Sequence, residues 1–240
     1  MNHSISKLKQ IITKAPQTIF FGGAGVSTES GIPDFRSKDG LYNQTYQYDP
    51  EYLLSLTGFR NHPDIFWQFY LEKILLDGIK PNKGHLALAR LEAAGKLQAV
   101  ITQNIDHLHE LAGSKNVYHL HGTVMTNHCT TCHQLYTLEQ IQQMDAVPQC
   151  TCGATIKPDV VFFEEMLPEE AWQQSLDAIR RANTLIVAGT SLTVYPAASL
   201  VHEFSGENLI IINRDETDSD SLATMIIRDS IAEVLDALVD

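Results

Sequence analysis

The pattern of apolar residues along the chain predicts an alternation of strands and helices. Apolar runs of strand length lie at residues 18–21, 98–102, 184–188 and 208–212. Apolar residues with helical spacing recur in the segments 63–77, 84–94, 168–182, 196–204 and 229–239. Alternating strands and helices favour a parallel sheet that is covered by helices on both faces. The sequence therefore predicts a doubly wound α/β fold.

One stretch interrupts this alternation. Residues 123–157 are polar, rich in Thr and Gln, and contain every cysteine of the chain, which is typical of a small inserted module. A chain of 240 residues is long enough for one domain, or for one domain with such an insert. Within a single unit spanning residues 1–240, we expect three parts. They are a Rossmann-like part at about 1–35, 84–122 and 158–240, a helical insert at about 37–83 and the small module at about 123–157.

The first apolar run ends in a turn that favours phosphate binding. Gly23 and Gly25 follow the run Thr18–Phe21, and residues without a Cβ allow a sharp turn and a close approach to a pyrophosphate. The dehydrogenase fingerprint is incomplete. Thr28 stands where a third glycine is expected, and no acidic residue ends a strand about 20 residues later. The turn predicts a nucleotide of the NAD type that is bound otherwise than in a dehydrogenase.

Composition and charge narrow the class of protein. The formal net charge is −12, with 44% hydrophobic and 19% charged residues. Such a charge disfavours non-specific nucleic-acid binding, and it suits basic partners, although many acidic cytosolic proteins are simply soluble. No apolar run approaches a membrane span, and residues 4–14 have helical spacing rather than a signal-peptide core. We expect a cytoplasmic protein with no membrane partner and no specific nucleic-acid partner.

The four cysteines form two close pairs, Cys129/Cys132 and Cys150/Cys152, with 17 residues between the pairs. Such pairs predict a tetrahedral zinc site of four thiolates, which is closed and therefore structural. The second pair is C-x-C, tighter than the usual spacing, and neighbouring histidines are alternative ligands. Two disulfides are the competing interpretation, but they are rare in intracellular proteins. Because the insert has few apolar residues, metal binding is expected to supply much of its folding free energy.

Six short segments carry a family resemblance. They are Gly23–Gly25, Asp34–Arg36, Thr102–Asp106, His121–Gly122, Lys157–Phe163 and Gly189–Ser191. Their order and spacing resemble the sirtuins, the NAD-dependent protein-lysine deacylases, over nearly the whole chain. The resemblance implies a Rossmann-like NAD-binding domain with a small zinc module, NAD as co-substrate, and acetylated-lysine proteins or peptides as partners. It implies transfer of the acetyl group to ADP-ribose, with release of nicotinamide and O-acetyl-ADP-ribose.

The resemblance also implies roles for residues at the predicted strand ends. His121 is the expected general base on a ribose hydroxyl, a role that a near-neutral pKa suits. Asn104 is expected to orient the ribose and a water, and Ile105 and Asp106 are expected to line the nicotinamide pocket. Phe35 is expected to shield the reacting ribose face. The other cofactor-binding residues implied are Gly23, Ala24, Gly25, Ser27, Thr28, Asp34, Arg36, Gln103, Gly189, Thr190, Ser191, Asn213 and Ile231.

Substrate contacts are implied by the segment after Lys157. Val161, Phe162 and Phe163 are expected to pair with the substrate peptide as an added strand, beside an apolar tunnel for the acyl-lysine stem. The family usually has Gly-Glu after these residues. Here Glu164 and Glu165 add a carboxylate, which favours a changed peptide preference, for example for basic flanking residues.

The acyl group is addressed by a second segment. Family members selective for succinyl or malonyl groups carry a Tyr-x-x-Arg pair before Pro-Asn-x-Gly-His, and here that pair is Tyr70 and Lys73. Lysine lacks the planar fork that binds a carboxylate bidentately. We therefore expect both residues at the acyl group, and a deacetylase with at most weak activity on acidic acyl groups.

Other interpretations compete with these roles. From the residues alone, Asn104 and Asp106 could cap a loop, and Arg36 could pair with Asp34 rather than with a phosphate. An ADP-ribosyltransferase would use the same cofactor but would pass the ribosyl group to a protein. A non-enzymatic zinc-ribbon module would leave His121, Asn104 and Asp106 without a role.

Overall fold

The larger of two sheets organises the fold. The computed structural model describes residues 3–15, 17–35, 40–76, 78–144 and 147–239. Six parallel strands follow the order β3-β2-β1-β7-β8-β9. They are β1 (Thr18–Gly22), β2 (Ala99–Thr102), β3 (Val117–His119), β7 (Thr184–Ala188), β8 (Asn208–Ile212) and β9 (Met225–Ile227). The order reverses at β1, which is the switch point of a doubly wound sheet.

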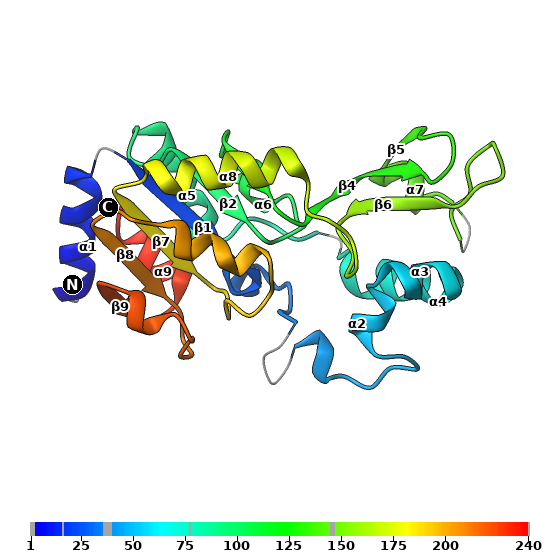
Figure 1. Cartoon of the computed structure of the whole chain (residues 1–240), viewed down its shortest axis with the longest axis horizontal. Coiled ribbons are helices and arrows are strands. Elements are labelled where there is room, and N and C mark those ends of the chain that lie inside the picture. Colours follow the sequence, from blue (N-terminus) through cyan, green and yellow to red (C-terminus); the bar gives the residue numbers. More distant parts are fainter. Residues whose placement is uncertain (1–2, 16, 36–39, 77, 145–146, 240) are drawn as a thin grey trace.

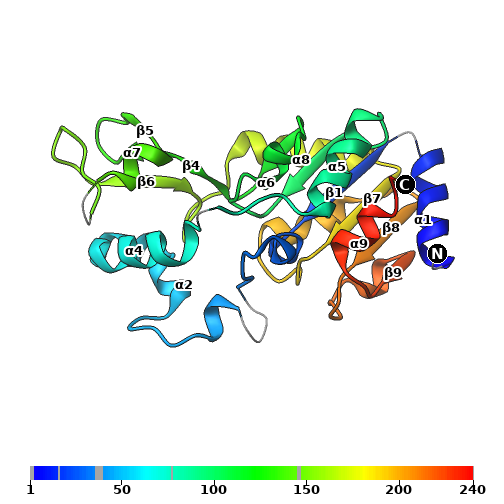
Figure 2. The same ribbon diagram turned by 180° about the vertical axis from the view of Figure 1, so that it is seen from behind.

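Alternate residues of the strands pack against helices on opposite faces of this sheet. Phe20 and Ile186 contact α1 (His3–Lys14), α5 (Lys83–Ala93) and α9 (Ile231–Asp236) on one face. Phe21 and Val187 contact α8 (Glu169–Arg181) and the 3₁₀ helix η5 (Ala197–Glu203) on the other. Figures 1 and 2 show these two helix layers, one on each face of the large sheet. Both chain termini lie at the end of the molecule far from the smaller sheet. Both faces are covered, which explains why the strands are almost entirely apolar.

A smaller part lies at the opposite end of the molecule (Figure 1). Its antiparallel sheet has the order β5-β4-β6, from β4 (Gly122–Cys129), β5 (Leu135–Thr137) and β6 (Ile156–Val160). Its helices are α2 (Pro50–Leu53), α3 (Leu56–Asn61), α4 (Pro63–Phe69), the π-helix η4 (Tyr70–Ile74) and α7 (Leu138–Gln142). Residues of the α2–η4 segment and of the small sheet share one hydrophobic core.

Short elements complete the chain. The helix α6 (Leu108–Ala112) packs against α5. Short 3₁₀ turns are η1 (Ala24–Val26), η2 (Thr28–Ser30), η3 (Leu41–Asn43) and η6 (Asp220–Leu222). No helix in the described part of the chain combines the length and the apolar character that membrane spanning requires.

The doubly wound fold predicted from the sequence is confirmed by this topology. Two predicted helices differ in form: residues 197–203 are a 3₁₀ helix, and the segment predicted at 63–77 changes from α-helix to π-helix at Tyr70. The edge strand β9 was not predicted, since three residues are too few to give a pattern.

Candidate active site

A cavity of about 650 Å³ opens beside the carboxyl ends of β1, β2 and β7. Ligands of doubly wound sheets bind at this position, because the connections leave the switch point in opposite directions and a crevice forms between them. Most residues singled out from the sequence line this cavity. They are Gly23, Ala24, Gly25, Ser27, Asp34, Phe35, Lys73, Gln103, Asn104, Ile105, Asp106, His121, Val161, Phe162, Phe163, Gly189, Thr190, Ser191 and Asn213.

Two glycine loops interlock on one wall of the cavity. The Gly25 amide donates to the Gly189 carbonyl at 2.8 Å. A Cβ on Gly25 would lie 2.7 Å from the Gly189 Cα, and a Cβ on Gly189 would lie 2.5 Å from the Val26 nitrogen. Only glycine permits this approach, and backbone without side chains can come close to a pyrophosphate. The loops therefore fit a dinucleotide.

A chain of polar side chains connects the loop after β1 to the loop after β2. The Asn104 amide nitrogen donates to Ser27 Oγ at 3.1 Å, and Ser27 Oγ donates to Asp106 Oδ2 at 2.8 Å. The Leu108 amide donates to Asp106 Oδ1 at 3.1 Å. With its nitrogen engaged, Asn104 has its amide oxygen available as an acceptor. Asn104 is only 8% exposed, so burial and the hydrogen bond to Ser27 together fix the orientation of its side chain.

The loop after β2 is also tied to the loop after β7. The Gln103 side-chain amide donates to Thr190 Oγ1 at 3.0 Å, and the Gln103 backbone amide donates to the Gly22 carbonyl at 2.9 Å. Loops from three adjacent strands are thus held in one hydrogen-bonded frame around the cavity.

His121 has a defined tautomer. Its Nδ1 lies 2.8 Å from the Gln103 carbonyl oxygen, and a carbonyl can only accept, so Nδ1 carries the proton and Nε2 is the basic nitrogen. Burial lowers the pKa of His121, and the hydrogen bond to Gln103 acts in the opposite direction. A neutral imidazole with a free Nε2 can accept a proton from a ligand hydroxyl.

Gly122 explains why glycine follows this histidine. Its φ is +75°, and a Cβ at this position would lie 1.9 Å from the Asp159 carbonyl oxygen. The close packing of β4 against β6 at this point aligns the Val161 amide to donate to the His121 carbonyl at 2.9 Å. The histidine and the segment after β6 are therefore fixed to each other.

Residues 161–163 differ from a regular strand. β6 ends at Val160, and Phe163 forms an isolated parallel bridge with Ser55. The Phe163 amide donates to the Leu54 carbonyl at 3.0 Å, and the Leu56 amide donates to the Phe163 carbonyl at 3.1 Å. Phe162 is 2% exposed and belongs to the core, whereas Phe163 is 38% exposed. The backbone edge that carries the Phe163 amide and carbonyl is therefore already paired within the protein.

Three residues expected at the site do not line the cavity. Thr28 donates through Oγ1 to the Gly25 carbonyl at 3.0 Å, so it stabilises the glycine loop without facing the cavity. Ile231 is 7% exposed at the start of α9. Tyr70 is fully buried in the core of the smaller part. Arg36, expected to position the cofactor, lies outside the described residues.

The π-helix explains the correction at Tyr70. The family resemblance implied that Tyr70 and Lys73 both lie at the acyl group, and residues three apart in an α-helix do share a face. Instead, the Leu75 amide bonds to the Tyr70 carbonyl five residues back, at 3.0 Å, which widens the turn. The Tyr70 ring packs 5.4 Å from both Phe66 and Trp67, while Lys73 lines the cavity.

The sequence did not single out several lining residues. Ile74, Leu75, Leu76 and Ile79 follow the π-helix and line the cavity, as do Asp215 and Glu216 after β8. The acidic pair follows the predicted strand 208–212, and the carboxyl end of a parallel strand is a position that indicates ligand binding. The apolar residues gave no signal, because helical spacing alone assigned them to the core.

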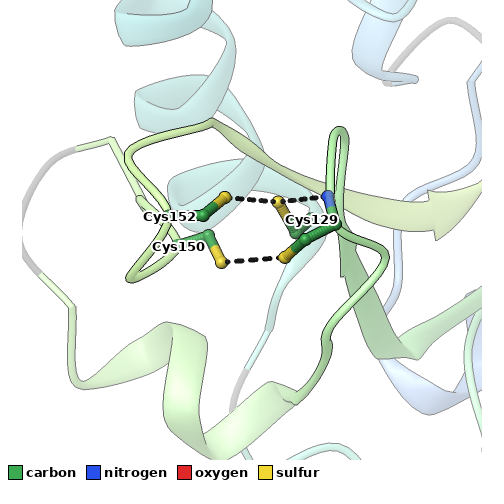
Figure 3. Close-up of side chains that lie close together, drawn as sticks. Cys129, Cys150 and Cys152 are labelled. Carbon is green, nitrogen blue, oxygen red and sulfur yellow. Dashed lines mark hydrogen bonds between the residues drawn. The ribbon is translucent and has the colours of Figure 1, made fainter.

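The four cysteines come together between β4 and β6. Their sulfur atoms all lie within 4.8 Å of one another, with Sγ–Sγ distances of 3.4 Å for Cys129–Cys152 and 3.5 Å for Cys132–Cys150. Figure 3 shows the labelled sulfur atoms turned toward a common centre. These distances are too long for disulfides, which need about 2.05 Å. A zinc ion with Zn–S bonds of about 2.3 Å would set its sulfurs about 3.8 Å apart, so the cluster fits zinc.

Backbone amides support the thiolate form of Cys129. The amides of Thr131 and Cys132 each donate to Cys129 Sγ at 3.4 Å, and the contact from Cys132 is the main cause that lowers the pKa of Cys129. Zinc binds thiolates rather than thiols. The cluster lies apart from the cavity, because none of the four cysteines lines it.

The fold and the site together define a class: α/β proteins of the dinucleotide-binding type, with a histidine beside the switch point of the sheet and a separate four-cysteine cluster. The sequence matches the Sir2 family over residues 23–196. A protein of Clostridium perfringens named NAD-dependent protein deacetylase is 50% identical, over all of both chains. The chain belongs to the Sir2 family.

Solved structures give the same result. A Sir2 histidine-to-alanine variant, with deacetylated p53 peptide and 3'-O-acetyl ADP ribose, is 38% identical at a TM-score of 0.92. That match covers 98% of this chain and 97% of the other. A Sir2 structure with p53 peptide and NAD⁺ is 39% identical at a TM-score of 0.86, covering 98% of this chain and 96% of the other.

Proposed function

We propose that the protein is an NAD-dependent protein-lysine deacetylase that acts on acetylated-lysine proteins or peptides. It transfers the acetyl group to ADP-ribose and releases nicotinamide and O-acetyl-ADP-ribose. Membership of the Sir2 family supports this activity, as does the name of the clostridial relative. The observation that carries the proposal is His121, which presents a basic Nε2 in a cavity whose glycine loops fit a dinucleotide.

The residues that would hold NAD surround the switch point. The Gly23–Gly25 loop and Gly189–Ser191 would contact the pyrophosphate and the adenosine half, and Asn213 would reach a ribose hydroxyl. Asp106 and Ile105 would line the nicotinamide end. When bound, NAD supplies a ribose carbon that can be attacked as nicotinamide leaves.

His121 and Asn104 carry the catalytic roles in this proposal. His121 Nε2 takes the proton of a ribose hydroxyl, and the Nδ1 contact to Gln103 keeps the ring in the tautomer that this step requires. The Asn104 amide oxygen, fixed through the contact of its nitrogen with Ser27, orients the ribose or a water. The Gln103 backbone holds both side chains in place, because its carbonyl binds His121 and the next residue is Asn104.

The substrate peptide is assigned to the rim formed by Val161 and Phe163. Both line the cavity, and Phe162 anchors the segment in the core of the smaller part. The four cysteines hold one zinc ion per chain, which supplies folding free energy and takes no part in the chemistry. Four zinc-binding thiolates need a reducing compartment, which supports a cytoplasmic location.

A peptide panel tests the activity. Matched peptides with lysine, acetyl-lysine or succinyl-lysine are incubated with the enzyme, with and without NAD, and the products are identified by mass spectrometry. We expect loss of the acetyl mass only with NAD, formation of O-acetyl-ADP-ribose, and inhibition by added nicotinamide. Equal deacetylation by NAD-stripped enzyme would contradict the proposal. A peptide that gains the mass of ADP-ribose would identify an ADP-ribosyltransferase instead.

A further inference from the structure

Glu164 is a residue with an unusual backbone. Its φ is +75°, in the region that favours glycine. The Glu165 amide donates to the Phe162 carbonyl at 3.1 Å, which closes a turn over residues 162–165. A turn with positive φ at its third residue normally has glycine there. A glutamate at this position must therefore be held by contacts that offset the backbone strain.

The Glu164 side chain makes such contacts. Its Oε2 accepts from the Thr57 amide at 2.9 Å and from Thr57 Oγ1 at 2.8 Å. Thr57 lies in the first turn of α3, where amides have no partner within the helix. Ser55 Oγ accepts from the Gly58 amide at 2.9 Å, and Glu164 accepts from the neighbouring Thr57 amide. The contact joins residues 107 positions apart in sequence.

Glu165 points elsewhere and holds the other side of the turn. Its Oε2 accepts from the Phe162 amide at 2.8 Å and lies 2.9 Å from Lys157 Nζ. The two adjacent glutamates thus fasten one turn to two different elements, α3 and β6. Neither carboxylate is left without a partner inside the protein.

We propose that Glu164 is a positioning residue for peptide binding, because its clasp on Thr57 holds the turn that follows Phe163 against α3. This inference rests on the proposed function. Phe163 pairs with Leu54 and Leu56, and the next residue, Glu164, binds Thr57. The two sets of contacts are therefore adjacent along both segments. Together they fix the segment that contains Val161 and Phe163, the rim to which the acyl-lysine peptide is assigned. The carboxylate acts as a hydrogen-bond acceptor and not as a charge that selects basic flanking residues.

Four variants separate acceptor, charge and backbone strain. Glu164→Gly removes both the acceptor and the strain, and Glu164→Ala removes the acceptor alone. Glu164→Gln keeps one oxygen that can accept both hydrogen bonds but removes the charge. Thr57→Val removes the hydroxyl donor, and Thr57→Ser, which keeps both donors, is its matched control.

Steady-state kinetics with acetyl-lysine peptides give the first readout. We expect the Gly and Ala variants to raise the KM for peptide roughly threefold to tenfold, with kcat and the KM for NAD unchanged. Glu164→Gln is expected to keep the wild-type KM for peptide, because the acceptor oxygen remains. Thr57→Val should raise the peptide KM by itself, yet add nothing to Glu164→Gly. An unchanged peptide KM in Glu164→Gly would overturn the proposal.

Peptides flanked by lysine or by glutamate give the second readout. If Glu164→Gln alone shifts the preference between them, the carboxylate reads substrate charge and the positioning role is overturned.

Hydrogen exchange tests the clasp without any activity. We expect faster exchange of the Thr57 and Phe163 amides in Glu164→Gly than in Glu164→Gln, and equal exchange would overturn the clasp. This readout keeps the inference separate from the proposed function: an inactive wild-type enzyme would refute the activity, while the exchange data would still decide the clasp.

Discussion

At the scale of the residue, His121 owes its chemistry to one backbone contact. The Gln103 carbonyl fixes the Nδ1 proton. The close turn at Gly122 places His121 beside Val161, a residue of the proposed peptide rim. No other titratable side chain is needed to define the tautomer. The fold alone therefore determines that Nε2 is the basic nitrogen, before any ligand binds.

This arrangement predicts the effect of removing the imidazole. His121→Ala should lower kcat/KM for deacetylation by about 10²–10⁴-fold, the usual cost of a lost general base. NAD binding and the thermal unfolding midpoint should change little, because the ring is only partly buried. His202→Ala, at an exposed histidine on η5, is the matched control. Near-normal turnover by folded His121→Ala would show that the base lies elsewhere.

The pH dependence follows from the same residue. Because burial lowers the pKa of His121, the neutral form persists below the ordinary histidine value of about 6.5. Catalysis by a general base is lost when the base is protonated, so activity should fall only as pH drops below that value. A profile of kcat/KM against pH, which reports free-enzyme groups, should have its acid limb below 6.5. An acid limb above 6.5, in enzyme shown to be folded, would contradict the assignment.

At the scale of the element, the strands were the most predictable part. Runs such as 184–188 are buried on both faces, so their composition alone identifies them. The small sheet was not resolved from the sequence, because β4 is a half-buried strand with the polar sequence Gly122–Cys129. The cysteine spacing nevertheless predicted the four-cysteine cluster in this part, because two close cysteine pairs are a stronger signal than strand propensity.

The π-helix shows why part of the site could not be predicted. Sequence spacing treated residues 70–74 as α-helical, and only the i+5 hydrogen bond reveals that Tyr70 and Lys73 diverge. Likewise, the contact of Glu164 with Thr57 joins distant segments, for which the sequence has no periodic signal. Strand-end motifs were predictable, whereas contacts made by tertiary packing were not.

Lys73 allows a prediction about acyl preference. Its ammonium is a single-point cation beside the cavity, without Tyr70 as a partner, so wild-type enzyme should favour acetyl over succinyl groups by kcat/KM. Lys73→Arg should raise desuccinylation roughly threefold to tenfold and deacetylation less, because a guanidinium binds a carboxylate bidentately. Lys80→Arg, at an exposed lysine that does not line the cavity, is the control. Faster removal of succinyl than acetyl by wild-type enzyme would refute this.

At the scale of the whole molecule, the two sheets contribute different walls to one cavity. The large sheet supplies the loops of Gly25, Asn104 and Gly189, and the smaller part supplies Phe163 and Lys73. The smaller part has one core, in which the buried Cys129 and Cys150 pack with Phe59, Phe66 and Ile156. The metal site and the peptide rim are therefore parts of the same folded unit, although the cysteines do not reach the cavity.

This connection predicts that losing the metal impairs catalysis from a distance. Cys150→Ala leaves three ligands and removes a buried residue of the shared core, so we expect the zinc content to fall from one ion per chain to near zero. Because structural zinc supplies folding free energy, hydrogen exchange should then rise in β4, β6 and α4. It should stay unchanged in β7 and β8, whose core is separate.

Activity should fall mainly through a raised KM for peptide, since the dinucleotide loops lie on the large sheet. Thr151→Ala, at the exposed residue between the two cysteines of the second pair, is the matched control and should retain zinc. Metal analysis of wild-type protein purified under reducing conditions tests the premise. Full activity in zinc-free protein would show that the smaller part keeps its shape without the metal, and would contradict the coupling between the metal site and peptide binding.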